Sequence, residues 1–403
     1  MSTAITYQAQ KYKPGELKPG DVILSNHPIA GGTHLPDITT ITPVFDSEEN
    51  PTEIIFFVAN RGHHADVGGI QPGSMPPDST ELWQEGASFD SFLVVRQGAF
   101  DEEGLTRILY DIPAQYPGSS GTRTLHDNIA DLKAAIASNQ KGIQLIHSLV
   151  QEYSWPITDF YMRAVRENAA QAVRTLLKSF AKAYHGEILS AVDYNDDGVP
   201  FVLNITIDEK SGDAVFDFTG TGPEHYGNLN CPPACMYSSI MVCCPLFFFF
   251  FFLIGVPNNI QYCIRSMVTT DIPLNQGCLE PIKIICPPGT ILTPSLEAAT
   301  VGCTSETSQR IVDVILHAFN AAAASQGSMN NLTFGYGGTD PKTGKIVKGF
   351  GYYETIAGGA GAGADWVGAS GVHSHLTNTR MTVSIAKKKK KKKGGFQEEK
   401  RSS

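Results

Sequence analysis

The sequence predicts an α+β fold with mixed β-hairpins and helices, not a doubly wound parallel sheet. The 403 residues are 42% hydrophobic and 18% charged, which is typical of a globular protein. Strand-like runs come first, helical periodicity follows, and a second pair of strands precedes a further helix. Because strands and helices do not alternate regularly, a repeating βαβ arrangement is not expected.

Two antiparallel hairpins are predicted. Residues 38–45 and 54–59 are rich in β-branched and aromatic residues and flank a polar turn. A short apolar run at 21–24 precedes them. Residues 199–207 and 214–218 alternate around a Glu-Lys-Ser-Gly turn and indicate the second hairpin.

Helices are predicted between and after these hairpins. Apolar residues recur at helical spacing over 119–150, and residues 161–184 continue without Gly or Pro. A further helix is expected over 304–324, which is rich in Ala and aliphatic residues. Residues 335–371 are rich in Gly and aromatic residues, and we interpret them as loops with a turn at 340–345.

An uncharged segment at 240–256 contains six consecutive Phe residues. Its length approaches that of a membrane-spanning helix, but Pro245 and Gly255 interrupt it and no basic residues flank it. We therefore predict no membrane span. The Phe run resembles a translated low-complexity nucleotide tract, so we expect a foreign insert at about 242–262.

The C-terminal end contains seven consecutive Lys residues, 387–393. We expect one domain over 1–382 and an unrelated, disordered, Lys-rich tail at 383–403. The formal net charge is −9 despite the Lys run, which argues against nucleic-acid binding through phosphate contacts.

The cysteines and the N-terminus indicate a reducing compartment. Eight Cys residues are too few for a disulfide scaffold, and Cys231-x3-Cys235 followed by Cys243-Cys244 matches no metal-binding spacing. We therefore interpret them as buried thiols. The first twenty residues contain no apolar segment typical of a signal peptide, so a cytoplasmic location is expected.

Two H-x-x-D tetrads flank the first hairpin. His34 and Asp37 lie before its first strand, while His63, His64 and Asp66 lie after its second strand. Antiparallel pairing about a turn centred at 49–50 brings both tetrads to the open end of the hairpin.

That pairing places Asp37 opposite residues 61–62 and His34 opposite Ala65. Mixed imidazole and carboxylate groups suit Zn, Mn or Fe better than Mg or Ca. Two alternatives remain: a polar hairpin end with hydrogen-bonded histidines, and Asp37 acting as a general base oriented by a neighbouring His. His64 and Asp66 are further catalytic candidates.

Two other clusters are candidates for substrate binding. Arg123 lies at a predicted helix start, where an arginine and the helix N-terminus can hold an anion. His373 and Arg380 follow a Gly-rich segment, and Arg380 can pair with a substrate carboxylate. A helix cap and a surface arginine are the structural alternatives. No dinucleotide fingerprint or P-loop is present, so the sequence contains no recognisable nucleotide site.

The tetrads lie within longer stretches that resemble the hydantoinase B/oxoprolinase family, specifically the C-terminal half of 5-oxoprolinases. The resemblance extends over about residues 4–382, except for the Phe-rich segment. The stretches that carry it are residues 20–45, 59–77, 83–89, 120–142, 216–230, 271–284 and 354–380.

The resemblance implies a cyclic amide hydrolase that opens 5-oxo-L-proline to L-glutamate in glutathione metabolism. Members of this group require ATP, Mg²⁺ and K⁺, and the ATP-handling hydantoinase A-like half is missing from this sequence. Related modules hold a divalent metal, which implies His34, Asp37 and His63 as ligands of Zn, Mn or Mg.

The resemblance also implies a lactam substrate, a hydantoinase A-like partner and a homo-oligomer. Two alternatives stay open: a subunit of a hydantoinase or ketone carboxylase, and an inactive truncated chain.

Overall fold

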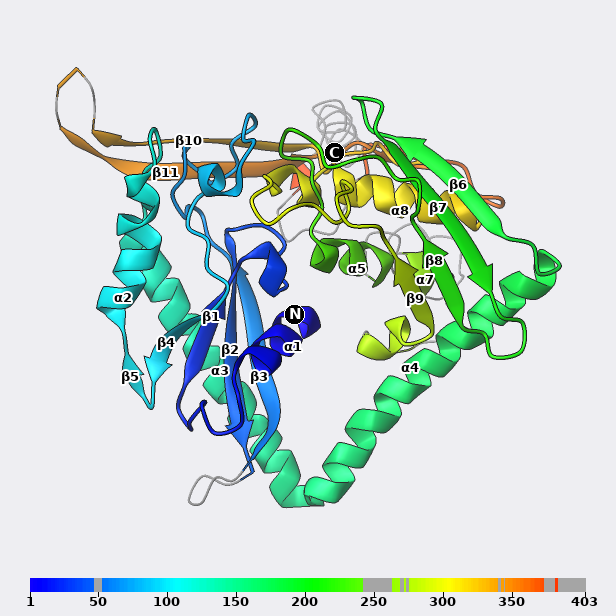
Figure 1. The fold of residues 1–403 in the computed structure, drawn as a ribbon, viewed down its shortest axis with the longest axis horizontal. Helices are drawn as coiled ribbons and strands as arrows, with labels where there is room; N and C mark the ends of the chain where they lie inside the picture. Colours follow the sequence, from blue (N-terminus) through cyan, green and yellow to red (C-terminus); the bar gives the residue numbers. More distant parts are fainter. Residues whose placement is uncertain are drawn as a thin grey trace, which may run out of the picture.

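The computed structural model combines several small sheets with two long helices, which confirms the α+β prediction (Figure 1). It describes residues 1–46, 53–241, 263–268, 272, 275–339, 342–343, 345–372 and 381–382. The expected insert at 242–262 and the expected tail at 383–403 lie outside the described residues. In the described part, no helix combines the length and the apolar character that crossing a membrane requires.

The N-terminal half contains a five-stranded sheet of order β3-β2-β1-β4-β5. The short apolar run predicted at 21–24 forms its central strand, which is buried throughout because neighbours pair with it on both sides. The predicted hairpin is formed by β2 and β3. The strands are β1 (Val22–Ser25), β2 (Asp37–Phe45), β3 (Ile54–His63), β4 (Phe92–Arg96) and β5 (Ala99–Phe100).

The register of this hairpin differs from the prediction by one or two residues. Asp37 pairs with His63, whereas the sequence suggested residues 61–62. The register shifts between Val44 and Phe45, where β3 carries one extra residue. A turn centre inferred from the sequence alone cannot include this irregularity.

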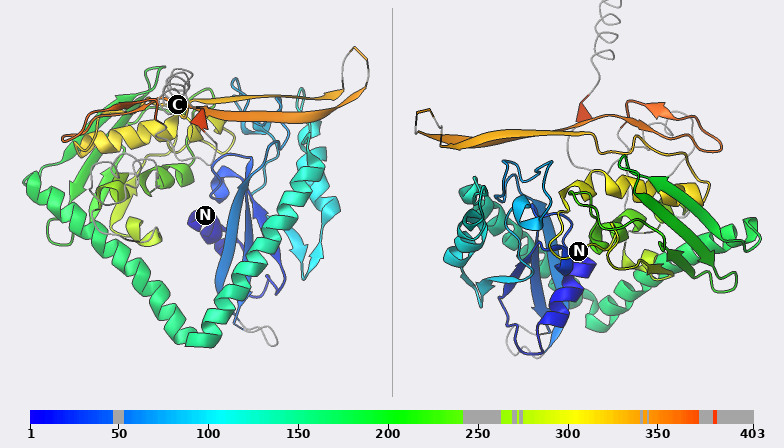
Figure 2. Two further views of the ribbon diagram at one scale, coloured as in Figure 1. Left: turned by 180° about the vertical axis from the view of Figure 1, so that it is seen from behind. Right: turned by 45° about the horizontal axis from the view of Figure 1, so that its top comes forward.

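Two long helices, α3 (Leu125–Tyr153) and α4 (Trp155–Ala183), form a V that joins the two halves (Figure 1). They meet at Ser154, whose φ of 73° bends the chain between them. The predicted helix at 119–150 therefore starts at Leu125, and the second helix starts before residue 161. Figure 2 shows from behind that the arms of the V carry different parts of the molecule.

The remaining helices of the described segments are short. The α-helices are α1 (Ser2–Lys11), α2 (Glu102–Thr106), α5 (Pro233–Met241), α7 (Cys263–Met267) and α8 (Thr307–Ala318). The short 3₁₀ helices are η1 (Pro28–Ala30), η2 (Leu82–Glu85), η4 (Pro113–Gln115), η5 (Gln276–Leu279) and η6 (Val301–Thr304), and η3 (Arg107–Asp111) is a π-helix.

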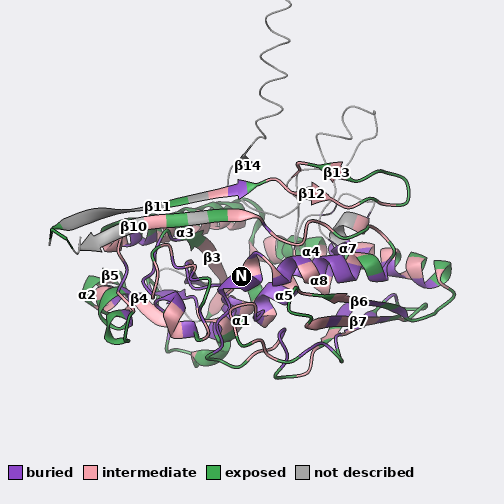
Figure 3. Cartoon of the chain, turned by 90° about the horizontal axis from the view of Figure 1, so that it is seen from above, coloured by how far each residue is buried: buried purple, intermediate pink, exposed green. Residues whose placement is uncertain are grey.

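The second half is organised around a four-stranded sheet of order β6-β7-β8-β9, which includes the second predicted hairpin. Helix α8 contacts β6 and β7 and is buried along most of its length (Figure 3). The predicted helix extended to residue 324, but α8 ends at Ala318. Asn320 follows in the left-handed conformation, with a φ of 50°, which is typical of a residue just after a helix. The strands are β6 (Leu189–Tyr194), β7 (Pro200–Ile207), β8 (Ala214–Asp217) and β9 (Ile282–Ile285).

The loops predicted at 335–371 are in part a long hairpin, so that prediction was wrong. Strands β10 (Asn331–Thr339) and β11 (Ile346–Ile356) pair over most of their length. The glycines in this segment are compatible with strands, because the hydrogen bonds of a β-ladder involve only backbone groups. Gly335, for example, pairs with Gly351. Three short strands complete this region: β12 (Gly359–Ala360), β13 (Ala369–Ser370) and β14 (Met381–Thr382).

Candidate metal centre

The open end of the β2–β3 hairpin brings three of the predicted residues together. Asp37 begins β2, His63 ends β3, and the two residues pair across the ladder. His34 comes from the turn that leads into β2, where the Asp37 N–H donates to the His34 carbonyl at 3.0 Å. The strand register and one turn therefore bring these three residues together, although His63 is far from the other two in the sequence.

The Asp37 carboxylate bridges the two imidazoles. Its Oδ2 lies 2.7 Å from His34 Nδ1, and its Oδ1 lies 3.0 Å from His63 Nδ1. The ring centroids of His34 and His63 are 5.0 Å apart. One donor atom from each of the three residues lies within 4.8 Å of the others, so the three residues form a group that could hold one metal ion.

The electrostatics of the cluster favour an ionised Asp37. Burial acts to raise the pKa of its carboxyl group, but His34 and His63 outweigh burial and hold that pKa well below its usual range. Burial likewise acts to lower the pKa of His34, and Asp37 reverses the effect and raises it. The three side chains thus form a coupled group with an anion at its centre.

Neighbouring groups fix the orientation of Asp37. Thr33 Oγ1 donates to Asp37 Oδ2 at 2.6 Å. The guanidinium of Arg61 donates to Thr39 Oγ1 at 2.8 Å and to the Gly31 carbonyl at 2.7 Å, so it ties the loop to the strands.

Gly32 shows how tightly this loop is packed. A Cβ atom at this position would lie 1.9 Å from the backbone oxygen of Asn26. Glycine is therefore required by close backbone approach, as expected for the glycines beside the tetrad.

The donor set fits a divalent metal of the Zn or Mn type. Two imidazoles and one carboxylate are a common ligand set for such ions, and they leave coordination positions open. His34 Nε2 is buried and has no hydrogen-bond partner among the described residues. His63 is the accessible member, with 45% of its side chain exposed. Small molecules can therefore reach the cluster from the His63 side.

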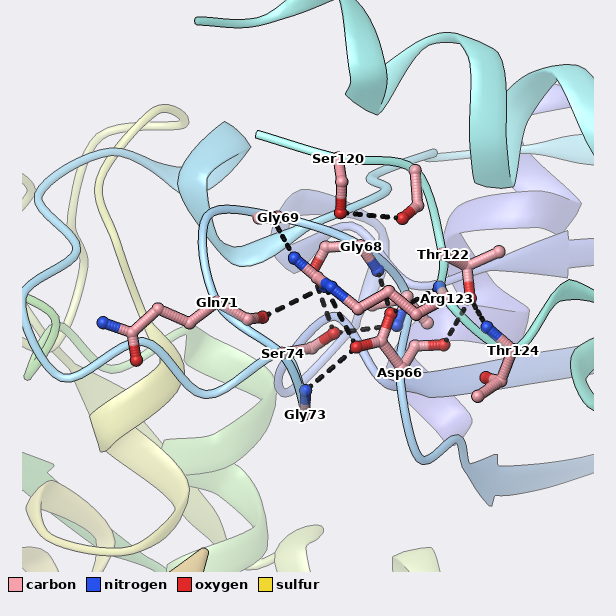
Figure 4. A network of polar contacts seen from close by, with 12 residues as sticks. Asp66, Gly68, Gly69, Gln71, Gly73, Ser74, Ser120, Thr122, Arg123 and Thr124 are labelled. Carbon is pink, nitrogen blue, oxygen red and sulfur yellow. Dashed lines mark hydrogen bonds and ion pairs between the residues drawn. The ribbon is translucent and has the colours of Figure 1, made fainter. Parts of the chain in front are cut away.

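The structure places Asp66 and Arg123 in a separate network (Figure 4). Asp66 accepts hydrogen bonds from the backbone N–H groups of Gly68 and Gly73 at 2.9 Å each, and its Oδ2 lies 3.1 Å from Arg123 Nη1. Arg123 also donates to the carbonyls of Gly69 and Gln71. Both residues therefore organise the loop after β3, and their catalytic and substrate-binding roles stay predictions.

The remaining candidates border the cluster or lie beyond the described residues, and His64 interacts electrostatically with His63 and Asp37. His64 is buried, and its Nδ1 lies 3.1 Å from Asn128 Nδ2. Burial lowers the pKa of His64, which favours a neutral ring. His373 and Arg380 lie outside the described residues.

Glu85 is a buried residue near the site, and the sequence makes it a weak candidate for lactam binding because it lies in the family-like stretch 83–89. Its Oε1 accepts hydrogen bonds from the N–H groups of Thr300 at 2.8 Å and Val301 at 3.0 Å. Burial raises the pKa of Glu85 to about 7, and His34 is near enough to interact with it electrostatically. The sequence also offers a signal for this residue, because Glu85 is the one charged residue in the stretch 82–89.

The chain belongs to the hydantoinase B/oxoprolinase family. The sequence profile of this family, described as Hydantoinase B/oxoprolinase, matches residues 1–248 and 256–384. The chain is 47% identical to 5-oxoprolinase 1 of Arabidopsis thaliana, over 95% of this chain and 28% of that protein. It is 48% identical to the 5-oxoprolinase of Saccharomyces cerevisiae, over 92% of this chain and 27% of that protein.

The fold is also found in a solved structure. The crystal structure of the ATP-dependent caprolactamase from Pseudomonas jessenii superposes with a TM-score of 0.67 at 20% identity. The match covers 92% of this chain and 58% of the caprolactamase chain. By comparison, the chain spans little more than a quarter of the length of the two 5-oxoprolinases from Arabidopsis thaliana and Saccharomyces cerevisiae.

Proposed function

We propose that this chain carries the lactam-processing module of a 5-oxoprolinase-type hydrolase, which opens 5-oxo-L-proline to L-glutamate. The observation that carries the proposal is the convergence of His34, Asp37 and His63 at one hairpin end. The relatives named 5-oxoprolinase support the choice of substrate class.

The residues of the cluster have distinct tasks in this proposal. Asp37 orients both imidazoles through its two carboxylate oxygens, and Thr33 and Arg61 hold the loop that carries them. His63 faces the accessible side, where a small lactam can approach. When bound, a divalent cation such as Zn²⁺, Mn²⁺ or Mg²⁺ supplies Lewis-acid polarisation of the reacting oxygen.

ATP hydrolysis is assigned in this proposal to a hydantoinase A-like half or subunit. Opening an unstrained lactam needs chemical activation, and the sequence contains no recognisable phosphate-binding motif. The curated relatives are more than three times as long as the matched region, so they contain other parts that can bind and hydrolyse ATP.

An exposed apolar surface around the α3–α4 bend is our proposed docking site for that half. Large apolar side chains gather there on both sides of Ser154, and such clusters in soluble proteins mark interfaces. Most of the length of the relatives lies outside the matched region, so partner surface for this module is available in them. The exposed residues are Leu145, Leu149, Tyr153, Ile157, Phe160, Tyr161, Met162 and Val165.

Reconstitution tests the proposed function. This chain is mixed with a separately expressed hydantoinase A-like half of the yeast 5-oxoprolinase, and oxoproline-dependent ATP hydrolysis and glutamate are measured. We expect activity that is lost in His34→Ala/His63→Ala and retained in His126→Ala, because the His126 side chain is 96% exposed and is not part of the cluster. Equal activity in all three proteins contradicts the assigned site, and ketone-dependent hydrolysis indicates a carboxylase instead.

The docking surface is tested separately by co-purification with the same half. Leu149→Asp/Phe160→Asp should abolish binding, whereas Glu167→Gln, an exposed polar change on α4, should leave it intact. Unchanged binding in the double variant, with a reduced mass of this chain alone, would assign the surface to a homo-oligomer and contradict the docking proposal.

A further inference from the structure

A second cluster of metal-binding side chains lies in the core of the C-terminal half. Cys231, Cys235 and Cys303 converge so that their sulfur atoms all lie within 4.8 Å of one another. All three are buried, reduced cysteines. Cys231 and Cys235 frame the start of α5, while Cys303 comes from η6, so the third member lies far away in sequence.

Backbone contacts hold the two segments in place. The Gly302 N–H donates to the Asn228 carbonyl at 2.9 Å, and the Cys231 N–H donates to the Ile291 carbonyl at 2.6 Å. Asn230 anchors the same loop, because its side chain donates to the carbonyls of Gly227 at 2.9 Å and Ala299 at 3.0 Å. The cysteines are therefore presented by rigid backbone.

The spacing of the sulfur atoms suits coordination. Two thiolates bound to one Zn²⁺ at about 2.3 Å lie roughly 3.8–4.0 Å apart, and the three sulfur atoms lie within 4.8 Å of one another. A disulfide needs a separation of about 2.0 Å. The cluster therefore resembles a set of ligands around a common centre more than a bonded pair.

The surroundings offer charge compensation. Three thiolates and a divalent cation carry a net charge of −1. Arg61 lies near enough to Cys235 for an electrostatic interaction, and it also interacts with Asp37. His34 interacts with Cys235 as well. The half-buried Arg61 guanidinium thus interacts electrostatically with both clusters.

We propose that Cys231, Cys235 and Cys303 form a binding site for a soft, thiolate-preferring cation of the class of Zn²⁺ and Cu⁺. Soft sulfur donors select such ions over Mg²⁺ or Ca²⁺. The site joins α5 to η6, whose first residue Val301 donates its N–H to Glu85, so the cation braces a segment that contacts the first half. This proposal is independent of the proposed lactam chemistry.

The site binds its cation by exchanging protons. Burial raises the pKa of Cys231 and Cys303 well above the usual value of a thiol, so both are protonated before the cation binds. Coordination requires the thiolate form, and uptake therefore releases protons and strengthens as pH rises.

Cobalt(II) substitution separates the two centres. The full chain is reduced, stripped with a chelator and titrated with Co²⁺, because thiolate ligation gives an intense near-ultraviolet charge-transfer band that imidazole and carboxylate ligation does not. We expect this band in the wild type and in His34→Ala/His63→Ala. It should be lost in Cys231→Ser/Cys235→Ser/Cys303→Ser.

The matched control is Cys278→Ser, which replaces a buried cysteine outside the cluster and should keep the band. Zinc content should fall by one ion per chain in the triple cysteine variant and stay unchanged in Cys278→Ser, and a parallel titration with Cu⁺ tests the monovalent member of the class.

A second measurement avoids the variants, in case serine does not support folding. X-ray absorption of Zn²⁺-loaded His34→Ala/His63→Ala should show sulfur neighbours at about 2.3 Å. Absence of the charge-transfer band from the wild type, or a zinc shell of nitrogen and oxygen alone in the His34→Ala/His63→Ala protein, would overturn the proposal.

Discussion

At the scale of single residues, the cluster of His34, Asp37 and His63, called here the hairpin centre, depends on glycine as well as on these three side chains. A Cβ at Gly32 would lie 1.9 Å from the Asn26 oxygen, and backbone atoms cannot move away as the end of a side chain can. At Gly62, next to His63, nothing lies within 4 Å of the position that a Cβ would occupy. These two glycines therefore offer a matched comparison.

Gly32→Ala should displace the loop that carries His34 and weaken metal binding. The expected loss of stability is about 1–3 kcal/mol, the usual cost of overpacking. Gly62→Ala should change both quantities little. Urea unfolding and calorimetric titration with Zn²⁺ measure the two effects, and equal metal affinity in both variants would show that the loop does not position the ligands.

A second prediction tests whether Asp66 has a structural or a catalytic role. Its carboxylate is buried and binds two backbone N–H groups and Arg123, so Asp66→Ala leaves these backbone groups and the partly buried Arg123 guanidinium without their acceptor. We expect a loss of about 3–5 kcal/mol in the free energy of unfolding.

The control for this change is Asp127→Ala, because the Asp127 side chain is 72% exposed and should cost almost nothing. A stable Asp66→Ala protein that binds metal but has no activity would instead support the catalytic assignment of Asp66.

At the scale of elements, one buried amide docks α3 onto the hairpin. Asn139 Nδ2 lies 3.1 Å from the carbonyls of Thr40 and Val58, and Asn60 Nδ2 donates to Asn139 Oδ1 at 2.8 Å. The amide thus joins both strands of the hairpin to the helix. Because these strands position Asp37 and His63 at their far end, α3 supports the centre at a distance.

Asn139→Ala should lower the free energy of unfolding by about 1–3 kcal/mol, because the Asn60 amide loses a buried acceptor. Gln140→Ala, at the exposed neighbouring position, should lie within about 0.5 kcal/mol of the wild type. Denaturant unfolding measures both changes. Similar values for the two variants would contradict a docking role for Asn139.

The elements also show how far the sequence could predict this fold. The β2–β3 hairpin and both long helices were predicted because period-two and period-3.6 patterns are local properties of the chain. The register was missed by one or two residues because the bulge beside Phe45 depends on strand pairing. The β10–β11 hairpin was missed because its glycines suggest loops, although backbone pairing alone sustains the ladder.

The same distinction applies to the candidate centre. His34, Asp37 and His63 were predicted to converge because one hairpin joins them. The pairing of Asp66 with Arg123 and the convergence of Cys303 with Cys231 both join segments more than fifty residues apart. No local pattern encodes such contacts, so they required the three-dimensional structure.

At the scale of the whole molecule, Glu85 links the two halves. It lies in η2 beside the first core, and its Oε1 accepts hydrogen bonds from backbone N–H groups of Thr300 and Val301 in the second half. Ser79 Oγ donates to the same oxygen at 3.1 Å. Among the described residues, Oε2 has no hydrogen-bond partner. The contact between the halves therefore contains a fully buried carboxyl group.

This arrangement predicts a pH-dependent stability. Burial raises the pKa of Glu85 to about 7 in the folded chain, against 4.5 for an unperturbed glutamate. Below pH 4.5 both states bind the proton, so Glu85 makes no difference there. As pH rises towards 7, the unfolded chain loses its proton first, and the folded state becomes less favourable by up to about 3 kcal/mol.

Glu85→Gln isolates this effect, because the amide keeps an acceptor for Thr300 and Val301 and cannot ionise. On chelator-treated protein, so that no bound cation acts on Glu85 or His34, the variant should gain stability relative to the wild type between about pH 5 and pH 8. Urea unfolding across this range measures the difference. If the difference in stability between Glu85→Gln and the wild type stays constant with pH, Glu85 is ionised in the folded chain. The N–H groups of Thr300 and Val301 would then stabilise its charge where the two halves meet.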